Sequence, residues 1–292
     1  MMKTTLTIVA LALATSVSAQ ESPLWMRYCA ISPDGSAVAF TYKGDIYTVP
    51  TTGGTARQLT TNAAYDTHPV WSPDSKQLAF CSNREGSMDV YVMQREGGTP
   101  RRLTTNSNSE TPIAFKDNNT VLYTSSIMPS AKSIIFANRM LPQVYEVGTN
   151  GSRPHLFSAL PMMDISIRPN GDLLYHDQKG YEDPWRKHHR SPITRDIWLR
   201  RGGKYTKLTN FNGEDRTPVW AAQGDTFYYL SEEDGTFNVY VRNIDGTGKQ
   251  QLTRHTTNPV RFLTAANNGT LCYGYDGEIY TLKQGEQPQK LK

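Results

Sequence analysis

One stretch of the chain, Thr67 to Thr104, recurs along the sequence and limits what the chain can fold into. It contains four short apolar runs. Turn-forming residues separate the runs, at Pro73 to Ser75, Asn83 to Gly86 and Glu96 to Gly98. Four strands joined by tight turns form an antiparallel meander, which is the blade of a β-propeller. We therefore interpret the stretch as one blade and search for its copies before any other motif.

Three markers recur six times in the same order. The third strand of each unit contains a polar residue, then a β-branched residue, then an aromatic residue. The aromatic residues are Tyr47, Tyr91, Tyr145, Trp198, Tyr240 and Tyr280. The second strand carries an aromatic at Phe40, Phe80, Tyr123, Tyr175, Tyr229 and Tyr273, and the fourth carries Leu59, Leu103, Phe157, Leu208, Leu252 and Leu291. A β-sandwich also has frequent turns, but it does not require repeated residue identities. The markers predict an all-β, six-bladed propeller with four antiparallel strands per blade.

The N-terminal segment, Met1 to Ala19, has the features of a signal peptide. Lys3 is its positive residue, Leu6 to Ala14 is apolar, and Val17-Ser18-Ala19 forms a small-residue cleavage site. The apolar run is too short to span a bilayer, and no Cys follows the cleavage site to carry a lipid. We expect an exported protein, periplasmic or extracellular, whose mature N-terminus is Gln20.

Residues 20–292 then form one propeller domain. The blades are expected at about residues 25–60, 66–104, 110–158, 163–209, 215–253 and 258–292. Each blade takes its four strands consecutively, so the ring is expected to close by packing between the first and last blades. The apolar residue ahead of each Ser-Pro-Asp turn, such as Trp71, is expected to face the next blade.

The three cysteines, Cys29, Cys81 and Cys272, fall in or at the end of predicted strands in three different blades. An odd number cannot all pair within one chain. We interpret them as buried small hydrophobic residues, and the sequence does not decide whether two of them form a disulfide.

Blades three and four are longer than the others, and the excess lies between their second and third strands. The insertions are Ser125 to Pro142 and Asp177 to Arg195, which should emerge side by side on one face. Long loops on a rigid scaffold often carry function. The insertions either pack on each other and cap the ring, or form an apolar and cationic docking surface for another domain or for an acidic group such as a peptide carboxylate. The candidate binding residues are Phe136, Trp185, Arg186, Lys187, His188, His189 and Arg190.

Motifs of catalysis are missing from the sequence. It has no G-x-S-x-G elbow, no H-E-x-x-H pair and no Gly-rich phosphate loop, and nothing orients a catalytic triad. His176, His188 and His189 with Asp177 and Asp183 are a weak metal hypothesis, because adjacent histidines point in different directions on an extended chain. We expect no metal and no cofactor.

Charge and strand composition exclude further classes. The net charge of +4 is spread along the chain, unlike the clustered basic stripe of a nucleic-acid binder. Asp45, Asp89 and Asp196 recur in register and are interpreted as hydrogen-bonding residues at strand edges. An enzyme working at the centre of the ring would need charged or His residues on the inner strands, where we expect Ala30, Ile31, Val70, Trp71, Ile113, Val219 and Trp220.

The repeats resemble those of two known groups. Trp-Ser-Pro-Asp turns, D-[IV]-[YW] about 18 residues later and [QRK]-L-T at the end of each unit look like the repeats of TolB-type and tricorn protease propellers. A signal peptide followed directly by the propeller, and Tyr181 to His189 in blade four, resemble the N-terminal part of secreted bacterial tricorn-like serine peptidases.

This resemblance implies a non-catalytic propeller that gates or channels peptides and supports a catalytic part outside this chain. The implied partners are peptides or further domains of the same polypeptide, and a homo-oligomer is left open. The alternative is a free-standing periplasmic TolB-like propeller that binds proteins. In that group an α/β domain precedes the propeller, whereas blade one here starts within a few residues of Gln20.

The docking hypothesis makes a first testable prediction. Replacing Trp185→Ala together with Arg186→Ala removes the aromatic and the first cation of the blade-four insertion. We expect weaker binding of an acidic peptide in isothermal titration, with an unchanged melting temperature. An unchanged binding isotherm would support the capping interpretation instead.

Overall fold

The computed structural model describes residues 25–127, 141–180, 188 and 190–292. All elements assigned in this part of the chain are β-strands. No helix within it is long and apolar enough to cross a membrane. The expected signal peptide lies outside the described residues.

The strands fall into six groups of four, which match the six predicted blades. The first three blades contain β1 (Arg27–Ile31), β2 (Ala37–Tyr42), β3 (Asp45–Pro50), β4 (Arg57–Gln58), β5 (Asp66–Trp71), β6 (Gln77–Glu85), β7 (Ser87–Gln94), β8 (Gly97–Arg102), β9 (Glu110–Asp117), β10 (Thr120–Ser125), β11 (Gln143–Gly148) and β12 (His155–Ser158). The last three contain β13 (Met162–Ile167), β14 (Leu173–Asp177), β15 (Ile197–Arg201), β16 (Lys204–Lys207), β17 (Asp215–Trp220), β18 (Thr226–Ser231), β19 (Asn238–Asn243), β20 (Gln250–Gln251), β21 (Arg261–Ala265), β22 (Leu271–Tyr275), β23 (Glu278–Leu282) and β24 (Gln289–Lys290).

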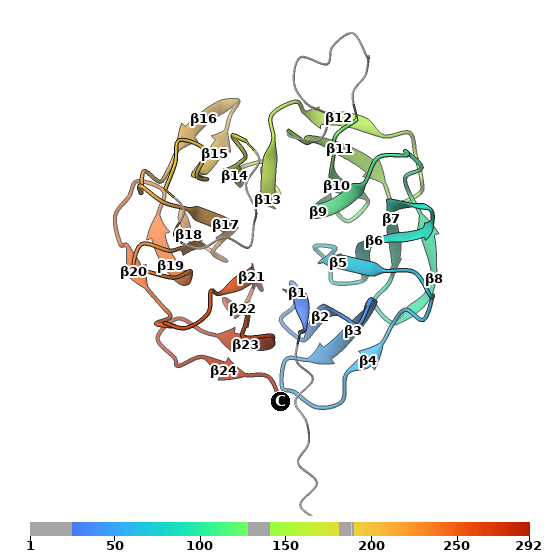
Figure 1. Cartoon of the computed structure of the whole chain (residues 1–292), viewed down its shortest axis with the longest axis horizontal. Coiled ribbons are helices and arrows are strands. Elements are labelled where there is room, and N and C mark those ends of the chain that lie inside the picture. Colours follow the sequence, from blue (N-terminus) through green and yellow to red (C-terminus); the bar gives the residue numbers. More distant parts are fainter. Residues whose placement is uncertain (1–24, 128–140, 181–187, 189) are drawn as a thin grey trace, which may run out of the picture.

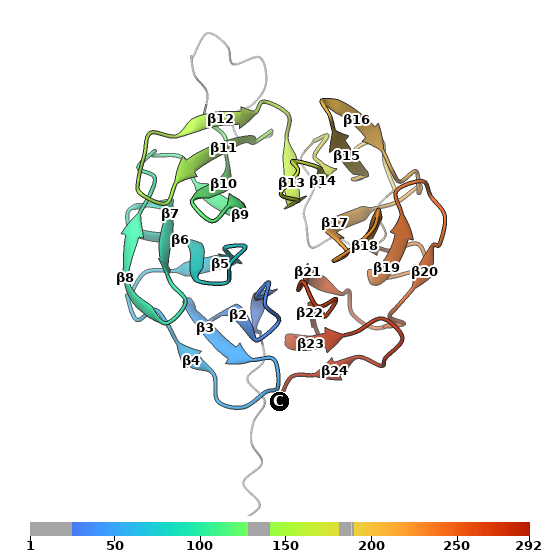
Figure 2. The same ribbon diagram turned by 180° about the vertical axis from the view of Figure 1, so that it is seen from behind.

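Each blade is an antiparallel sheet whose strands follow in chain order from the centre of the ring to its rim (Figure 1). The first strands, β1, β5, β9, β13, β17 and β21, surround the central axis, and the view from behind shows the same arrangement (Figure 2). The predicted all-β six-bladed propeller is therefore confirmed. The chain reverses between β6 and β7 at the predicted turn: the Gly86 amide donates to the Asn83 carbonyl at 3.0 Å, and the strand pairing extends into the turn, where Glu85 pairs with Ser87.

The Leu-Thr pair that ends four of the units ties the fourth strand to the third. In blade two, the Leu103 amide donates to the Val90 carbonyl at 2.8 Å, and the Val90 amide donates to Thr104 Oγ1 at 2.9 Å. The same two bonds recur with Leu59-Thr60, Leu208-Thr209 and Leu252-Thr253. The threonine is buried each time, so its hydroxyl replaces water as the partner of a strand amide. The repeated L-T signal thus reflects a repeated hydrogen-bond requirement.

The Ser-Pro-Asp turns are also held by their own side chains. Ser72 Oγ donates to Asp74 Oδ1 at 2.7 Å and accepts the Gln77 amide at 2.9 Å. In blade one, Asp34 makes the same contact with Ser32 and additionally accepts Arg95 Nη1 of blade two at 2.6 Å. Desolvation of Asp34 is outweighed by hydrogen bonds from Ser32, Ser36 and Arg95, which lower its pKa.

The tryptophan ahead of the turn faces the preceding blade, not the next one, so that expectation was wrong. Trp71 Nε1 donates to the Ala30 carbonyl of blade one at 2.9 Å, and the ring packs in a cluster with Ala39, Ile46 and Leu59. Trp220 packs in the same way with residues of blade four. A strand exposes one face to each neighbouring blade, and in both blades the tryptophan lies on the face toward the preceding one. The indole N–H of Trp71 has a carbonyl partner there, whereas the buried Nε1 of Trp220 has none.

The cysteines are buried, as predicted, at 2%, 1% and 0% exposure for Cys29, Cys81 and Cys272. All three are free thiols in the structure. Cys29 lies in β1, Cys81 in β6 and Cys272 in β22.

The predicted hydrogen-bonding role of the recurring aspartates is also confirmed: Asp89 pairs with Arg102, and Asp196 with Lys179 and Lys207.

The Leu-Thr bonds make a stability prediction. Thr104→Val leaves the buried Val90 amide without its acceptor, so the free energy of unfolding should fall by about 1–3 kcal/mol. Urea denaturation followed by circular dichroism measures this. The neighbouring Thr105 is exposed, and Thr105→Val is the matched control, expected to stay within about 0.5 kcal/mol of the native protein. Equal stability of the two variants would contradict the role assigned to Thr104.

Candidate functional site

The inner strands share an irregularity at the central axis. Each shows a shift of register with its second strand. In five blades a residue at this shift has a positive φ, between 48° and 59°: Tyr28, His68, Asp164, Thr217 and Phe262. In blade three the matching residue is Pro112, whose ring holds φ negative. A left-handed backbone is unusual for aromatic and β-branched residues, and such outliers cluster at functional sites. We call the five residues the axial ring.

Tyr28 contacts the two other aromatic members of the axial ring, one on each side of its blade. The rings of Tyr28 and His68 have centroids 3.7 Å apart, and those of Tyr28 and Phe262 are 4.8 Å apart. These residues belong to blades one, two and six, whose inner strands meet around the axis (Figure 1). The contacts therefore form an apolar arc along half of the ring.

The other two members form a polar contact between blades four and five. Thr217 Oγ1 donates to Asp164 Oδ2 at 2.7 Å, and His176 Nδ1 lies 3.6 Å from the same oxygen. The Thr217 amide donates to His176 Nδ1 at 3.3 Å, so this nitrogen carries no proton and the ring is neutral. Burial lowers the pKa of His176 well below its usual value, and Arg195 and Arg216 lower it further.

Poor solvation distinguishes the titratable members of the axial ring. Desolvation lowers the pKa of His68 to about 4, so it is neutral at pH 7. The Asp164 side chain keeps 45% of its surface accessible, yet desolvation raises its pKa, because the surrounding blades displace bulk water from it. A carboxyl group in such surroundings gains more from a cationic or hydrogen-bonding ligand than one in open solvent.

A network of charges links this polar contact to the blade-four insertion. Arg195 Nη1 donates to Glu214 Oε1 at 3.1 Å, and Arg216 pairs with Glu214 Oε2. The Glu214 amide in turn donates to Glu232 Oε1 at 3.3 Å. Glu232 also accepts the backbone amide of His188 at 2.8 Å. The insertion is thus anchored on blade five through a main-chain contact of His188.

The sequence-predicted binding residues are described only in part. His188 and Arg190 are both exposed, and the His188 amide makes the contact with Glu232. Phe136, Trp185, Arg186, Lys187 and His189 lie outside the described residues, so the predicted surface stays a prediction. The insertions do leave blades three and four between the second and third strands, as predicted.

The sequence analysis did not predict the axial ring. His68 and Asp164 lie on inner strands at the axis, so the premise that these strands lack His and charged residues there was wrong. A constant spacing marks the positions: each axial residue stands three places before the apolar residue of the turn, as His68 does before Trp71 and Thr217 before Trp220. Side chains along a regular strand alternate between its two faces, and the sequence analysis assumed this alternation. The bulge breaks the alternation at the axial residue.

Cys81 lies next to the axial residue His68, so the two could be considered as a catalytic Cys-His pair. Cys81 Sγ lies 3.9 Å from His68 Nδ1, and Thr67 Oγ1 lies 3.2 Å from the same nitrogen. A catalytic Cys-His pair needs a thiolate, stabilised by an imidazolium. Burial acts in the opposite direction here, because it raises the pKa of Cys81 to about 12 and lowers that of His68. Both groups are neutral at pH 7, which is unsuited to nucleophilic attack.

A second group of perturbed carboxyls is structural. Glu110, at the start of β9, is 1% exposed, and desolvation raises its pKa to about 7. Its neighbours are Thr104 and Asp89, so the Leu-Thr bonds of blade two extend into blade three. A ligand cannot reach so enclosed a carboxyl without moving the blades apart.

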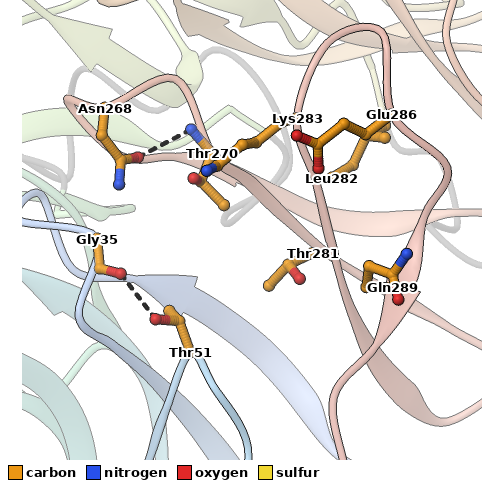
Figure 3. A pocket seen from close by; sticks show the side chains of 9 residues that line it. All are labelled: Gly35, Thr51, Asn268, Thr270, Thr281, Leu282, Lys283, Glu286 and Gln289. Carbon is orange, nitrogen blue, oxygen red and sulfur yellow. Dashed lines mark hydrogen bonds between the residues drawn. The ribbon is translucent and has the colours of Figure 1, made fainter.

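Two small hollows lie away from the axial ring. One, of about 210 Å³, lies between blades one and six and is lined by polar residues including Thr51, Asn268 and Glu286 (Figure 3). The other, of about 300 Å³, lies between blades three and four beside Phe157, with Lys116 and Arg200 near its ring.

Among the residues with described positions, no three His, Cys, Asp or Glu side chains are grouped as metal ligands. Asp177, one of the hypothetical ligands, instead accepts hydrogen bonds from Trp198 and Asp196.

The architecture and the axial ring define the class of this protein: a six-bladed propeller of consecutive meanders, in which each described blade supplies its own four strands. A family model described as "Tricorn protease N-terminal beta propeller domain" matches residues 23–288. The chain therefore belongs to the tricorn protease N-terminal β-propeller domain family.

Several individual proteins are similar to this chain in sequence or in fold. "Tricorn protease homolog 1" of Streptomyces coelicolor is 29% identical over 285 residues, which cover 94% of this chain and 25% of that protein. The crystal structure of the tricorn protease superposes with a TM-score of 0.78 at 19% identity, covering 93% of this chain and 26% of that one. TolB from Acinetobacter baumannii gives a TM-score of 0.62 at 15% identity, covering 88% and 60%. The chain spans about a quarter of the length of its tricorn relatives.

The Glu110 environment predicts a pH-dependent stability. Its folded pKa of about 7 lies above the value near 4.3 of a free glutamate, so the stabilising neutral form is lost as the pH rises through 7. Glu110→Gln stays neutral. We expect its stability relative to the native protein to increase by on the order of 2 kcal/mol between pH 5 and pH 8, measured by urea denaturation. Glu96→Gln, at an exposed position, should show no such trend, and the absence of a trend in Glu110→Gln would contradict the assignment.

Proposed function

We propose that this chain is the non-catalytic propeller domain of a tricorn-like serine peptidase, which passes peptides along its axis and supports a catalytic part. Membership of the tricorn N-terminal propeller family supports the domain assignment. The observation that carries the peptide role is the axial ring, in which five of the inner strands around the axis each hold a residue in a strained backbone conformation.

The chemistry of the axial ring suits a peptide. The apolar arc of Phe262, Tyr28 and His68 offers ring surfaces for side chains, and Asp164 with Thr217 offers a hydrogen-bonding wall. A mixture of apolar contacts and a few polar groups binds peptides of varied sequence without demanding one residue type. Neutral His68 and Cys81 leave the peptide bond without an activated nucleophile.

The two insertions emerge at the end of the ring where the inner strands begin. Ser125, the last residue of β10, pairs with both Glu110 and Gln143, and Asp177, the last residue of β14, pairs with Met162. The axial ring residues lie within three positions of those strand starts. Both insertions therefore leave the sheets at the end of the ring where the axial ring residues lie.

Peptide binding to the purified chain tests the proposal. Fluorescently labelled oligopeptides should bind with an affinity that Tyr28→Ala weakens roughly 2- to 10-fold, the effect of losing one aromatic contact. Tyr205→Ala, on the exposed outer strand β16, is the matched control and should leave the affinity unchanged. Mass spectrometry of the peptides after incubation should find them intact.

Two results would contradict the proposal. Equal affinities for the Tyr28 and Tyr205 variants would remove the axis from the binding site. Peptide hydrolysis that a single substitution in this chain abolishes would show that the domain is itself catalytic. A protein partner bound in place of peptides would favour the alternative of a TolB-like binding propeller.

We further propose that the protein is exported, with Met1 to Ala19 as its leader. The composition of this segment supports the proposal. Mass spectrometry of the protein recovered outside the cytoplasm should give Gln20 as its first residue. An intact Met1 in that fraction, or a protein confined to the cytoplasm, would contradict export by this route.

A further inference from the structure

The first and last blades lie side by side, although they are not consecutive in the chain. We call the contact between them the join. Within the described strands, each blade is complete in itself, and none borrows a strand from another (Figure 1). At this join we propose that Cys29 and Cys272 form a disulfide, which closes the ring covalently. The proposal is independent of the proposed function.

The two cysteines approach each other across strands β1, β21 and β22. The Ile31 amide of β1 donates to Thr264 Oγ1 of β21 at 3.0 Å, and Thr264 is the cross-strand partner of Cys272 in β22. Cys29 Sγ lies 3.7 Å from the Phe262 carbonyl on the same strand β21. Cys29 and Cys272 belong to one buried apolar cluster, which joins residues of the first and last blades. Cys29 of the inner strand β1 and Cys272 of the second strand β22 therefore meet on the face where blade one packs against blade six.

Main-chain hydrogen bonds also cross the join. The Met26 amide donates to the Gly277 carbonyl at 3.0 Å, the Asn267 amide to the Pro33 carbonyl at 2.8 Å, and the Gly54 amide to the Lys292 carbonyl at 2.6 Å. Further out, the blades leave the polar hollow of about 210 Å³ between Thr51 and Asn268, seen in Figure 3. A covalent link at the inner end would hold together a join that its outer end packs loosely.

The third cysteine provides a contrast. Cys81 lies in β6 of blade two and contacts His68 and the Thr67 carbonyl. It belongs neither to the apolar cluster of Cys29 and Cys272 nor to the join. The same protein therefore contains one cysteine pair and one buried cysteine that serves as an internal control.

Oxidation requires an external disulfide, for which oxidised glutathione is the simplest donor. One cysteine thiolate attacks this disulfide and releases one glutathione thiolate, and the second cysteine thiolate attacks the mixed disulfide and releases the other. The pair thus loses two electrons and two protons, and glutathione gains them. Both thiols are fully buried in the closed ring, where burial favours the unreactive protonated form of Cys272. The bond should form during folding, before the blades close, and only slowly in the folded reduced protein.

The cross-link would enclose nearly the whole propeller, because Cys29 is in the first strand and Cys272 in the last blade. A disulfide that closes a long loop removes many conformations from the unfolded chain. We expect the melting temperature of the oxidised protein to exceed that of the reduced protein by roughly 5–10 °C.

The experiment refolds the purified protein from denaturant in a buffer of reduced and oxidised glutathione. Free thiols are then alkylated under denaturing conditions, and the peptides are examined by mass spectrometry without reduction. The expected result is one linked pair of peptides that contain Cys29 and Cys272, with Cys81 alkylated. Three alkylated cysteines, or a link that involves Cys81, would overturn the proposal.

Variants provide a second, independent measurement. Cys29→Ala and Cys272→Ala should each have a melting temperature that does not change on reduction with dithiothreitol. Cys81→Ala should keep the full difference between oxidised and reduced forms. A native protein whose melting temperature is insensitive to reduction would contradict the proposal even if one of the variants failed to fold.

Discussion

The fold depends on satisfying backbone amides at the edge where the third strand of each blade meets the fourth. The fourth strands are only two to six residues long, too short to be held by a regular ladder alone. The Leu-Thr pair solves this with one main-chain bond and one hydroxyl acceptor at a buried amide, as Leu103 and Thr104 do for Val90. The pair occurs in four of the six blades, and there it fixes the point at which the chain leaves the fourth strand for the next blade.

The sequence predicted the fold well because its markers have direct physical causes. Asp74 recurs because it folds the Ser-Pro-Asp turn, and Thr104 recurs because it caps a strand amide. Such local bonds are made within one blade and need no knowledge of the neighbours. The direction of Trp71 was predicted wrongly for the same reason: alternation along a strand shows which residues share a face, but not which of two adjacent blades that face meets.

The candidate site was less predictable, since it depends on a backbone irregularity. His68 and Thr217 adopt positive φ without being glycine or asparagine, so residue type gives no signal for the bulge. Their constant distance from the following tryptophan is visible only once the bulge is known. The pKa of His68 depends equally on assembly, because the desolvation comes from blades distant in sequence. The neutral state of His68 and Cys81 follows from that enclosure rather than from either residue alone.

The bulge on each inner strand separates two tasks that a regular strand would combine. In β5, Val70 and Trp71 pack within the apolar clusters, while His68, within the register shift, instead contacts Tyr28 of the neighbouring inner strand. The identity of an axial residue is therefore free of the volume constraints that govern the apolar core. Tyrosine, histidine, aspartate, threonine and phenylalanine all occupy the same backbone position. The scaffold can thus be fitted with a new inner lining, one blade at a time, while the sheets that carry it stay the same.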